Sequence, residues 1–427
     1  MDMKWIAYVH DIAWTAADGT PLGGFAYTYD VVGRITARRH ALGTNRFDRA
    51  YAYDDLDRLA ADGSVSYAYD AAGNRTAKTG DVEGAVAYTR GVGDRLASWT
   101  GGAYTYDAAG NVTRIVRDGR PTLDLSWNGR YQLVSVSTNG VFAEGYAYDA
   151  LGRRASTTTW EGTVRHVYDD NWQVIADLDS NGNVLRSYVW GEGIDRLLAV
   201  KVGTKSYAAL TDAQGTVWGL VGGDGEIVAR WTYDAWGYVL SEEVTDPDLA
   251  AFRYRFQGRE FSAVTGLTNF RMRWYDPRTG RWLSKDPIGL NGGMNLYAMC
   301  EADCLNHIDP TGTAIWVGTR WGVHQNINVG DPNGKYSSYS FGVDDEMSSA
   351  GFRSLWPWNE AGVVYHDNPP SSVDNDLCIS TTKEQDEFAK DFLDGLVGNH
   401  DIYRIFGPNC RTFSQSMFQN FSRLWKK

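Results

Sequence analysis

The sequence has few of the features that hold disulfide-rich or membrane proteins together. Its four cysteines in 427 residues, Cys300, Cys304, Cys378 and Cys410, are too few for a disulfide scaffold. Cys300 and Cys304 stand four apart, unlike the two-residue gap of a zinc or redox pair, and we interpret them as packing residues. No apolar run approaches the ~20 residues that span a bilayer. The first residues also lack the apolar core of a signal peptide, so we expect no membrane span and secretion or surface display by a non-classical route.

Basic residues are also fewer than acidic residues. Lys and Arg number 41 against 53 Asp and Glu, for a formal net charge of −12, and the last 114 residues are acidic too. Proteins that bind nucleic acids usually carry a basic patch. The charge balance therefore predicts no nucleic-acid partner, while a nuclease remains an alternative for the C-terminal part.

Glycine and aromatic residues are abundant, and they recur in a repeat. The chain contains 47 Gly, 25 Tyr and 17 Trp but only 11 Pro, a composition that favours β-structure. Clear copies of Tyr-x-Tyr-Asp followed by a turn lie at 27–34, 51–58, 67–74, 104–111 and 146–153, and looser copies lie at 166–169, 231–237 and 273–276. Degenerate copies are expected at 91–99 and 127–133.

The physical chemistry of one repeat predicts a β-hairpin. Alternation puts both tyrosines on one face of a strand. The aspartate accepts hydrogen bonds from backbone amides of the turn, and a glycine three residues later supplies a positive φ. One hairpin cannot bury its own tyrosines, so neighbouring hairpins must stack. A plain β-solenoid or propeller would satisfy the same pattern.

The stretch 271–313 contains three Asp-Pro dipeptides, beginning at Asp276, Asp286 and Asp309, and each is followed by a glycine. Taken alone, this spacing predicts three tight turns. The run YDPRTGRWLSKDPIGLNGGMNLYAM…IDPTG, however, closely resembles the core signature of rearrangement-hotspot (RHS, or YD-repeat) proteins.

The resemblance implies a mainly β protein in three parts. Residues 1–250 would form a spiralling antiparallel β-shell, 251–313 the RHS-associated core, and 314–427 a small, variable α+β effector domain. Shells of this family are typically far longer, so we expect an incomplete cocoon that needs an upstream shell segment.

The resemblance also implies self-cleavage of the bond between Thr313 and Ala314. The matching residues are Asp286 and Asp309, with Lys285 in the place of a basic residue that often precedes the first. Two carboxylates held close together share a proton, so one can activate water while the other donates a proton. Without the resemblance, both aspartates would be interpreted as turn residues.

The pattern of residues 314–427 predicts strands and helices in one small domain. Strands are expected at 314–319, 321–330, 335–343, 362–367 and 401–406, and helices near 383–397 and 409–424. Cys410 would lie in the first turn of the last helix, where backbone amides favour a thiolate. His324 would lie on the polar face of its strand, available as a base.

The order of HQNINVG and GPNCRTFSQ resembles the circularly permuted papain-like fold, which includes NlpC-type amidases and lecithin:retinol acyltransferase-like enzymes. We expect Cys410 as nucleophile, His324 as base, and Ser340, or Ser338, as the third group, with no cofactor. Alternatives are a buried structural cysteine, His366 or His400 as the base, and a zinc site that includes Cys378.

These observations predict a secreted effector in which the shell carries a self-released, cysteine-dependent amide or ester hydrolase or acyltransferase. Its substrate would be a peptide, cell-wall amide or lipid of a target cell. Its partners would be an immunity protein and a secretion apparatus or upstream shell segment. The alternatives are a non-enzymatic cell-surface adhesion or carbohydrate-binding protein, and a toxin tail of another class.

Overall fold

The computed structural model describes residues 9–16, 19–81, 84–191 and 194–313, and beyond these the strands at 325–330, 336–343 and 362–367. The chain divides into two compact units, one of residues 9–315 and one of residues 1–8 with 316–427.

The described part of the first unit is dominated by one 23-stranded antiparallel sheet. The first twelve strands are β1 (Asp11–Thr15), β2 (Pro21–Tyr29), β3 (Ile35–Leu42), β4 (Asn45–Tyr53), β5 (Leu59–Asp62), β6 (Val65–Tyr69), β7 (Arg75–Asp81), β8 (Gly84–Arg90), β9 (Leu96–Trp99), β10 (Gly102–Tyr106), β11 (Val112–Arg117) and β12 (Leu123–Trp127). The others are β13 (Leu133–Thr138), β14 (Val141–Tyr148), β15 (Arg154–Thr159), β16 (Gly162–Tyr168), β17 (Val174–Leu178), β18 (Val184–Trp190), β19 (Leu197–Val202), β20 (Lys205–Thr211), β21 (Val217–Val221), β22 (Ile227–Tyr233) and β23 (Val239–Val244).

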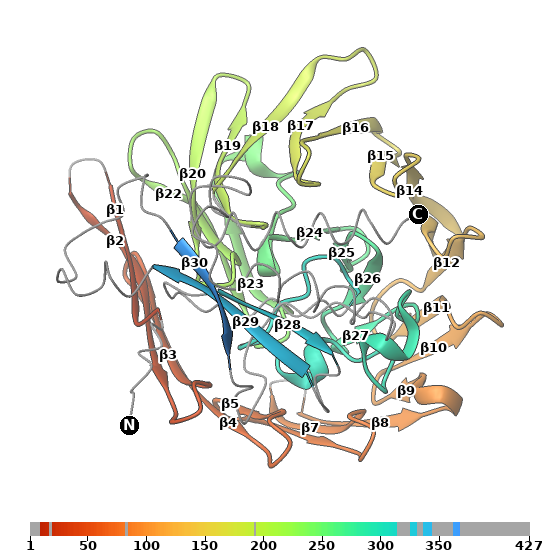
Figure 1. The fold of residues 1–427 in the computed structure, drawn as a ribbon. Helices are drawn as coiled ribbons and strands as arrows, with labels where there is room; N and C mark the ends of the chain where they lie inside the picture. The colour runs from red at the N-terminus through yellow and green to blue at the C-terminus, as the bar shows by residue number, and fades with distance from the viewer. Residues whose placement is uncertain are drawn as a thin grey trace. The chain divides into compact units, whose positions relative to one another are not determined.

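Each of these strands pairs with the next strand along the chain, for example β3 with β4 and β22 with β23. Figure 1 shows them following one another along an arc, from red β1 to green β23. Within the described residues no pairing joins β1 to β23, so the sheet is open rather than a closed barrel.

The Tyr-x-Tyr-Asp repeats form the turns of this sheet as predicted. At the third copy, Asp70 Oδ1 accepts hydrogen bonds from the backbone N–H groups of Ala72 and Asn74, each at 2.9 Å. Gly73 takes a φ of +74° in this turn, a value that glycine adopts without strain. The degenerate copy at 127–133 has the same geometry, because Asn128 Oδ1 accepts from the amides of Arg130 and Gln132.

The two tyrosines of a repeat differ in burial and in the contacts that they make. The first is buried, as at Tyr51 and Tyr146, each 6% exposed. The second ends its strand just after a register shift and sends its hydroxyl to the first residue of the preceding strand. Tyr53 donates to the Ile35 carbonyl at 2.8 Å, and Tyr148 donates to the Leu133 carbonyl at 2.8 Å. In these copies the hydroxyl therefore ties its strand to the preceding strand along the turn edge of the sheet.

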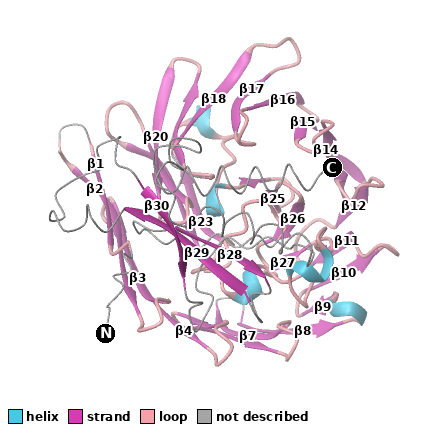
Figure 2. Ribbon diagram, viewed as in Figure 1, coloured by secondary structure: helices cyan, strands magenta, loops and turns pink. Residues whose placement is uncertain are grey.

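Residues 251–313, here named the core segment, lie on the inner side of the arc (Figure 1). A four-stranded sheet runs through the segment: β24 (Glu260–Phe261), β25 (Thr268–Phe270), β26 (Arg273–Asp276) and β27 (Arg281–Trp282). In the described chain the helical elements are short 3₁₀ turns, drawn in cyan in Figure 2: η1 (Val92–Asp94), η2 (Pro247–Leu249), η3 (Phe256–Gly258), η4 (Gly289–Gly292) and η5 (Cys300–Ala302). None of these turns is long enough to cross a membrane.

Side chains of the core segment reach strands that are far apart in the sequence. Asn306 Nδ2 donates to the Tyr53 hydroxyl at 2.8 Å, and Asp276 Oδ2 accepts from the Tyr104 hydroxyl at 2.6 Å. Arg259 pairs with Asp195 at 2.8 Å. The segment thus holds the early, middle and late strands of the arc together.

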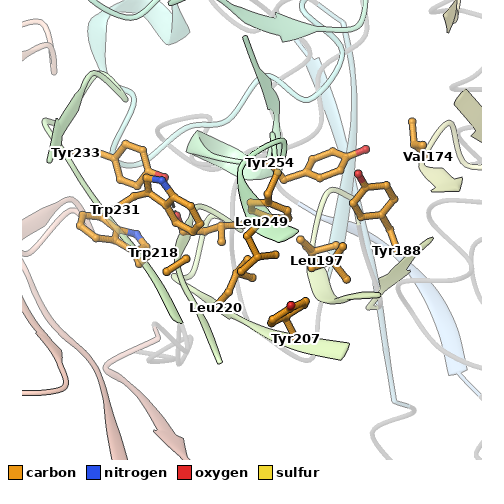
Figure 3. Packing of buried hydrophobic residues seen from close by; sticks show 14 of the residues in the cluster. Val174, Tyr188, Leu197, Tyr207, Trp218, Leu220, Trp231, Tyr233, Leu249 and Tyr254 are labelled. Atoms are coloured by element: carbon orange, nitrogen blue, oxygen red, sulfur yellow. Dashed lines mark hydrogen bonds between the residues drawn. The ribbon is translucent and has the colours of Figure 1, made fainter. Parts of the chain in front are cut away.

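The core segment also completes two apolar clusters. Phe252 and Tyr254 join a cluster of strand β2 and strands β17 to β22, in which Tyr254 meets Tyr188 edge to face at 4.9 Å (Figure 3). Leu267 and Trp274 join a second cluster of strands β8 to β14. The hydrophobic burial of the arc therefore depends on residues that lie after it in the chain.

The described part of the second unit is a three-stranded antiparallel sheet of β28 (Gln325–Gly330), β29 (Tyr336–Val343) and β30 (Gly362–Asp367). These strands fall within the predicted segments 321–330, 335–343 and 362–367. The strands predicted at 314–319 and 401–406 and both predicted helices lie outside the described residues.

Candidate functional site

Asp286 and Asp309, two of the three aspartates that precede a proline in the core segment, contact the same buried guanidinium. Nη2 of Arg273, on β26, lies 2.9 Å from Asp286 Oδ2 and 3.1 Å from Asp309 Oδ2. The three side chains are almost fully buried, with side-chain exposures of 1%, 1% and 3%. The aspartate pair expected from the sequence is therefore brought together, but with a shared cation.

Arg273 also reaches the last described residues of the first unit. Its Nε donates to the Gly312 carbonyl, and its Cζ lies 4.1 Å from the centre of the Trp282 ring. The guanidinium is planar and offers five N–H donors, so it can hold two carboxylates and a carbonyl at once. Arg273 therefore fixes where the chain leaves the core segment.

Asp309 shapes the turn before Thr313. Its Oδ1 accepts from the N–H groups of Gly312 at 2.8 Å and Thr313 at 3.0 Å. Gly312 has a φ of +71°, and a Cβ at this position would lie 2.5 Å from the Phe270 carbonyl oxygen. A side chain has neither the conformation nor the room here, so the glycine of this Asp-Pro-Thr-Gly turn is required by the structure.

Burial raises the pKa of Asp286 above its usual value, and the nearby Asp309 carboxylate raises it further, while Arg273 partly opposes both effects. Because its pKa is raised, the Asp286 carboxyl holds a proton more readily than an exposed aspartate does. The site thus contains a cation, a carboxyl with an increased proton affinity and a second carboxylate bonded to the residue before the predicted cleavage point.

Lys285 and Arg273 differ from the expectation based on the sequence. Lys285 is exposed, and no contact of its ammonium with either aspartate is recorded in the described structure. The cation at the site is Arg273, which the sequence analysis did not select. The signal for it was an arginine directly before the aromatic residues Trp274 and Tyr275 in the strand RWYD, because a charge buried beside such residues requires a partner.

A second group of buried ion pairs joins the core segment to the middle of the arc. Glu260 Oε2 accepts from Arg253 Nε at 2.5 Å and from Arg154, and Arg253 also pairs with Asp177. Burial alone would raise the pKa of Glu260, but the guanidinium groups of Arg154 and Arg253 outweigh it and hold that pKa well below its usual value. These ion pairs are an electrostatic link between the core segment and strands β15 and β17 of the arc.

The depressed pKa gives a testable pH dependence. A carboxylate of this kind contributes stability above its unfolded-state pKa, about 4.3, and loses it as the pH falls toward the folded-state pKa. We expect Glu260→Gln to lower the free energy of unfolding by about 3 kcal/mol at pH 7 and by progressively less below pH ~4. Urea unfolding at several pH values measures this difference, with Glu161→Gln at an exposed position as the control. A difference that does not change with pH would contradict the assignment.

The predicted cysteine–histidine site falls outside the described residues, since both Cys410 and His324 do. The same holds for Cys378 and His400. The register of the second sheet places Ser340 opposite Asn326 and Ser338 opposite Asn328. His366 lies on β30, opposite Tyr339. The cysteine mechanism therefore stays a prediction.

The other cysteines behave as expected of packing residues. Cys300 and Cys304 are free thiols, 7% and 0% exposed. Among the residues that the structure describes, no three or more His, Cys, Asp or Glu side chains are grouped as metal ligands would be.

Comparison with known proteins assigns the first unit to a family. The family model described as Teneurin YD-shell matches residues 19–292. The tRNA nuclease WapA of Bacillus subtilis (strain 168) is 31% identical over 312 residues, which cover 71% of this chain and 11% of that protein. The double-stranded DNA deaminase toxin A of Burkholderia cenocepacia (strain H111) is 28% identical over 425 residues, covering 84% of this chain and 28% of the relative.

Solved structures support the same fold. The structure of the Photorhabdus luminescens Tc holotoxin pore matches with a TM-score of 0.58 at 20% identity, over 71% of this chain and 17% of that chain. The present chain thus spans only a small part of the relatives that it matches. The repeats, the open antiparallel sheet and the match over residues 19–292 establish that the chain belongs to the Teneurin YD-shell family.

Proposed function

We propose that the chain is the C-terminal shell portion of a polymorphic toxin, and that its core segment releases residues 314–427 as the toxic domain. The observation that carries the proposal is the convergence of Asp286 and Asp309 on Arg273, at the point where the shell ends. The names of the relatives, a tRNA nuclease and a DNA deaminase toxin, support the toxin class.

The release step is hydrolysis of the Thr313–Ala314 peptide bond. One carboxylate removes a proton from water, whose oxygen adds to the Thr313 carbonyl carbon. The other carboxyl delivers a proton to the Ala314 nitrogen as the C–N bond breaks, leaving a carboxylate on Thr313 and a free amine on Ala314. The raised pKa of Asp286 suits it to hold the proton, and Asp309, bonded to the Thr313 amide, is the base.

Arg273 has two roles in this scheme. One of its nitrogens, Nη2, contacts both carboxylates. Its hydrogen bond to the Gly312 carbonyl holds the chain in place one residue before the peptide bond that is cut. Positioning of the reacting bond is a large part of any such rate enhancement. Because Arg273 acts through the two carboxylates and the Gly312 carbonyl, we treat it as a positioning residue.

For the released domain we propose covalent catalysis by Cys410 with His324 as base and Ser340 as the third polar group. The thiolate would attack an amide or ester carbonyl of a target-cell peptide, cell wall or lipid, and the imidazole would return the proton to the leaving group. A toxin of this kind requires an immunity protein in the producing cell, and a secretion apparatus or upstream shell segment for delivery.

A second candidate for the released domain is an enzyme that acts on nucleic acid. The relatives named as a tRNA nuclease and a DNA deaminase favour it, whereas the acidic composition of residues 314–427 opposes it. The two candidates can be told apart because only the first requires Cys410 and His324, and only the second alters nucleic acid.

We expect expression of the full chain to stop growth of a bacterial host, and Cys410→Ala and His324→Ala each to restore growth by at least tenfold in viable count. Cys378→Ala is the matched control and should stay toxic. Cell-wall fragments, lipids, tRNA and genomic DNA of the host are analysed after induction. If the Cys410→Ala variant stays toxic and the host tRNA is cut or its DNA bases are altered, the cysteine mechanism is wrong and the released domain acts on nucleic acid.

A further inference from the structure

A cavity of about 290 Å³ lies between two hairpins from opposite ends of the arc. One hairpin is β3–β4 and the other is β22–β23, and within the described residues no strand pairing joins them. The lining residues are Arg38, His40, Phe47, Arg49, Trp218, Thr232, Tyr233, Leu240 and Ser241. All of them belong to the first unit, so its own fold forms the cavity.

One wall of the cavity is aromatic. The Trp218 and Tyr233 rings meet edge to face at 5.1 Å, and both are labelled in Figure 3. His40 lies 4.4 Å from Trp218 and stacks on Phe47 at 5.5 Å. Burial and the charge of Arg38 lower the pKa of His40 to about 3, so this ring is neutral at physiological pH. Trp218 and Tyr233 are each 3% exposed, whereas Phe47 is 39% exposed, so the Phe47 ring is the flat, uncharged surface on which a planar ring can stack.

Next to the aromatic wall lies an arginine without a hydrogen-bond acceptor in the described structure. Arg38 is 9% exposed, and its Cζ lies 4.6 Å from the Trp218 ring. Within the described structure, no hydrogen bond or ion pair is recorded for its guanidinium. The charges of Asp212 and Asp62 act on it from a distance, but Asp212 Oδ2 already accepts from Trp218 Nε1 at 3.0 Å.

A largely buried guanidinium without a protein acceptor depends on water or a ligand in the adjoining cavity for its hydrogen bonds. Such a group in a native protein calls for a partner. Arg49 lies at the same cavity, with its Nη1 3.7 Å from Asp62 Oδ1 and a side chain 31% exposed. Two guanidinium groups beside an aromatic wall are complementary to a molecule that combines an anionic group with a flat ring.

We propose that this cavity is a binding site for a small organic anion that carries a planar ring. The ring stacks against Phe47, and the carboxylate or phosphate accepts hydrogen bonds from Arg38 and Arg49. The hydroxyls of Thr232 and Ser241, 2.6 Å apart, lie at the same cavity and offer further donors. The volume is close to the lower limit of ~300 Å³ for small-molecule sites, which suits one ring system with its acid group.

The test uses the full chain and two probes, indole-3-acetate for the carboxylate and adenosine 5′-monophosphate for the phosphate. Binding is measured by calorimetry, with indole-3-ethanol as the uncharged analogue of the first probe. We expect at least one anion to bind and the alcohol to bind at least tenfold more weakly. Arg38→Met should weaken binding of the anion by about tenfold or more, since charged hydrogen bonds are lost. Arg39→Met, at the exposed neighbouring position, should leave binding unchanged.

Thermal unfolding of the same variants separates binding from folding. Because Arg38 is a buried charge without a close partner, Arg38→Met should have an unchanged or higher melting temperature. A lower melting temperature together with unchanged binding would assign Arg38 a structural role and overturn the proposal. Ser241→Trp, at an exposed rim position, should block binding without unfolding the chain. Failure of both anions to bind the wild-type chain, or equal binding of the alcohol, would overturn the proposal as well.

Discussion

Asparagine in place of Asp309 is expected to leave the protein as one uncut chain. Wild-type protein should yield a C-terminal fragment that begins at Ala314. An amide can still accept the Gly312 and Thr313 N–H groups at Oδ1, but it cannot take a proton from water. Loss of a general acid or base typically slows a reaction by about 10²–10⁴-fold. We expect the same result for Asp286→Asn, and intact-mass analysis of freshly purified protein measures both.

Asp303→Asn provides the matched control for this experiment. Asp303 is a buried aspartate of the same segment, 3% exposed, whose carboxylate accepts from Asn306 rather than from Arg273. This variant should be cut like the wild type. If the wild-type chain persists uncut, or if both asparagine variants are cut at the normal rate, the aspartate pair is not a protease and its role is structural.

Arg273→Leu is expected to destabilise the first unit strongly. Removal of the guanidinium leaves two buried carboxylates facing each other without their shared cation, and it also removes the donor to Gly312. Breaking a buried ion pair in this way typically costs about 3–5 kcal/mol. Urea unfolding at pH 7 should show a loss in this range, whereas Arg39→Leu at an exposed site should have little effect.

The origin of this effect can be tested by removing the carboxylates as well. The triple variant Arg273→Leu, Asp286→Asn and Asp309→Asn no longer contains buried charges at the site. It should recover much of the lost stability, because a neutral group costs far less to bury than an unpaired charge. If the triple variant is as unstable as Arg273→Leu alone, packing against Trp282 rather than electrostatics accounts for the loss.

The repeats could be predicted from the sequence because their interactions are local. The Asp70 carboxylate accepts hydrogen bonds from backbone N–H groups two and four residues later in the chain. The spacing of Tyr-x-Tyr-Asp-x-x-Gly is therefore enough to predict the turn. The degenerate copy at Asn128 was recognisable for the same reason. The register shift before the second tyrosine was not foreseen, because it depends on the hydroxyl reaching the preceding strand.

The site could be predicted only in part. Asp286 and Asp309 were selected by resemblance to a family motif, and the structure brings them together. Arg273 was missed because its partners are 13 and 36 residues away in sequence, and no local rule joins an arginine in a strand to two later turns. Long-range charge pairing of this kind is a property of the folded core segment rather than of any one motif.

The placement of the core segment has a consequence for the order of folding. The strands of the arc pair only with their neighbours, so hairpins can form one after another while the chain is being synthesised. Side chains such as Asn306, Arg259 and Trp274, which join distant strands of the arc, are translated after the whole sheet. Until then, the tyrosine-rich inner face of the nascent sheet lacks its covering and is open to aggregation. A chain that ends before the core segment would therefore keep this inner face exposed, so the last residues of the shell protect the strands made before them from aggregation.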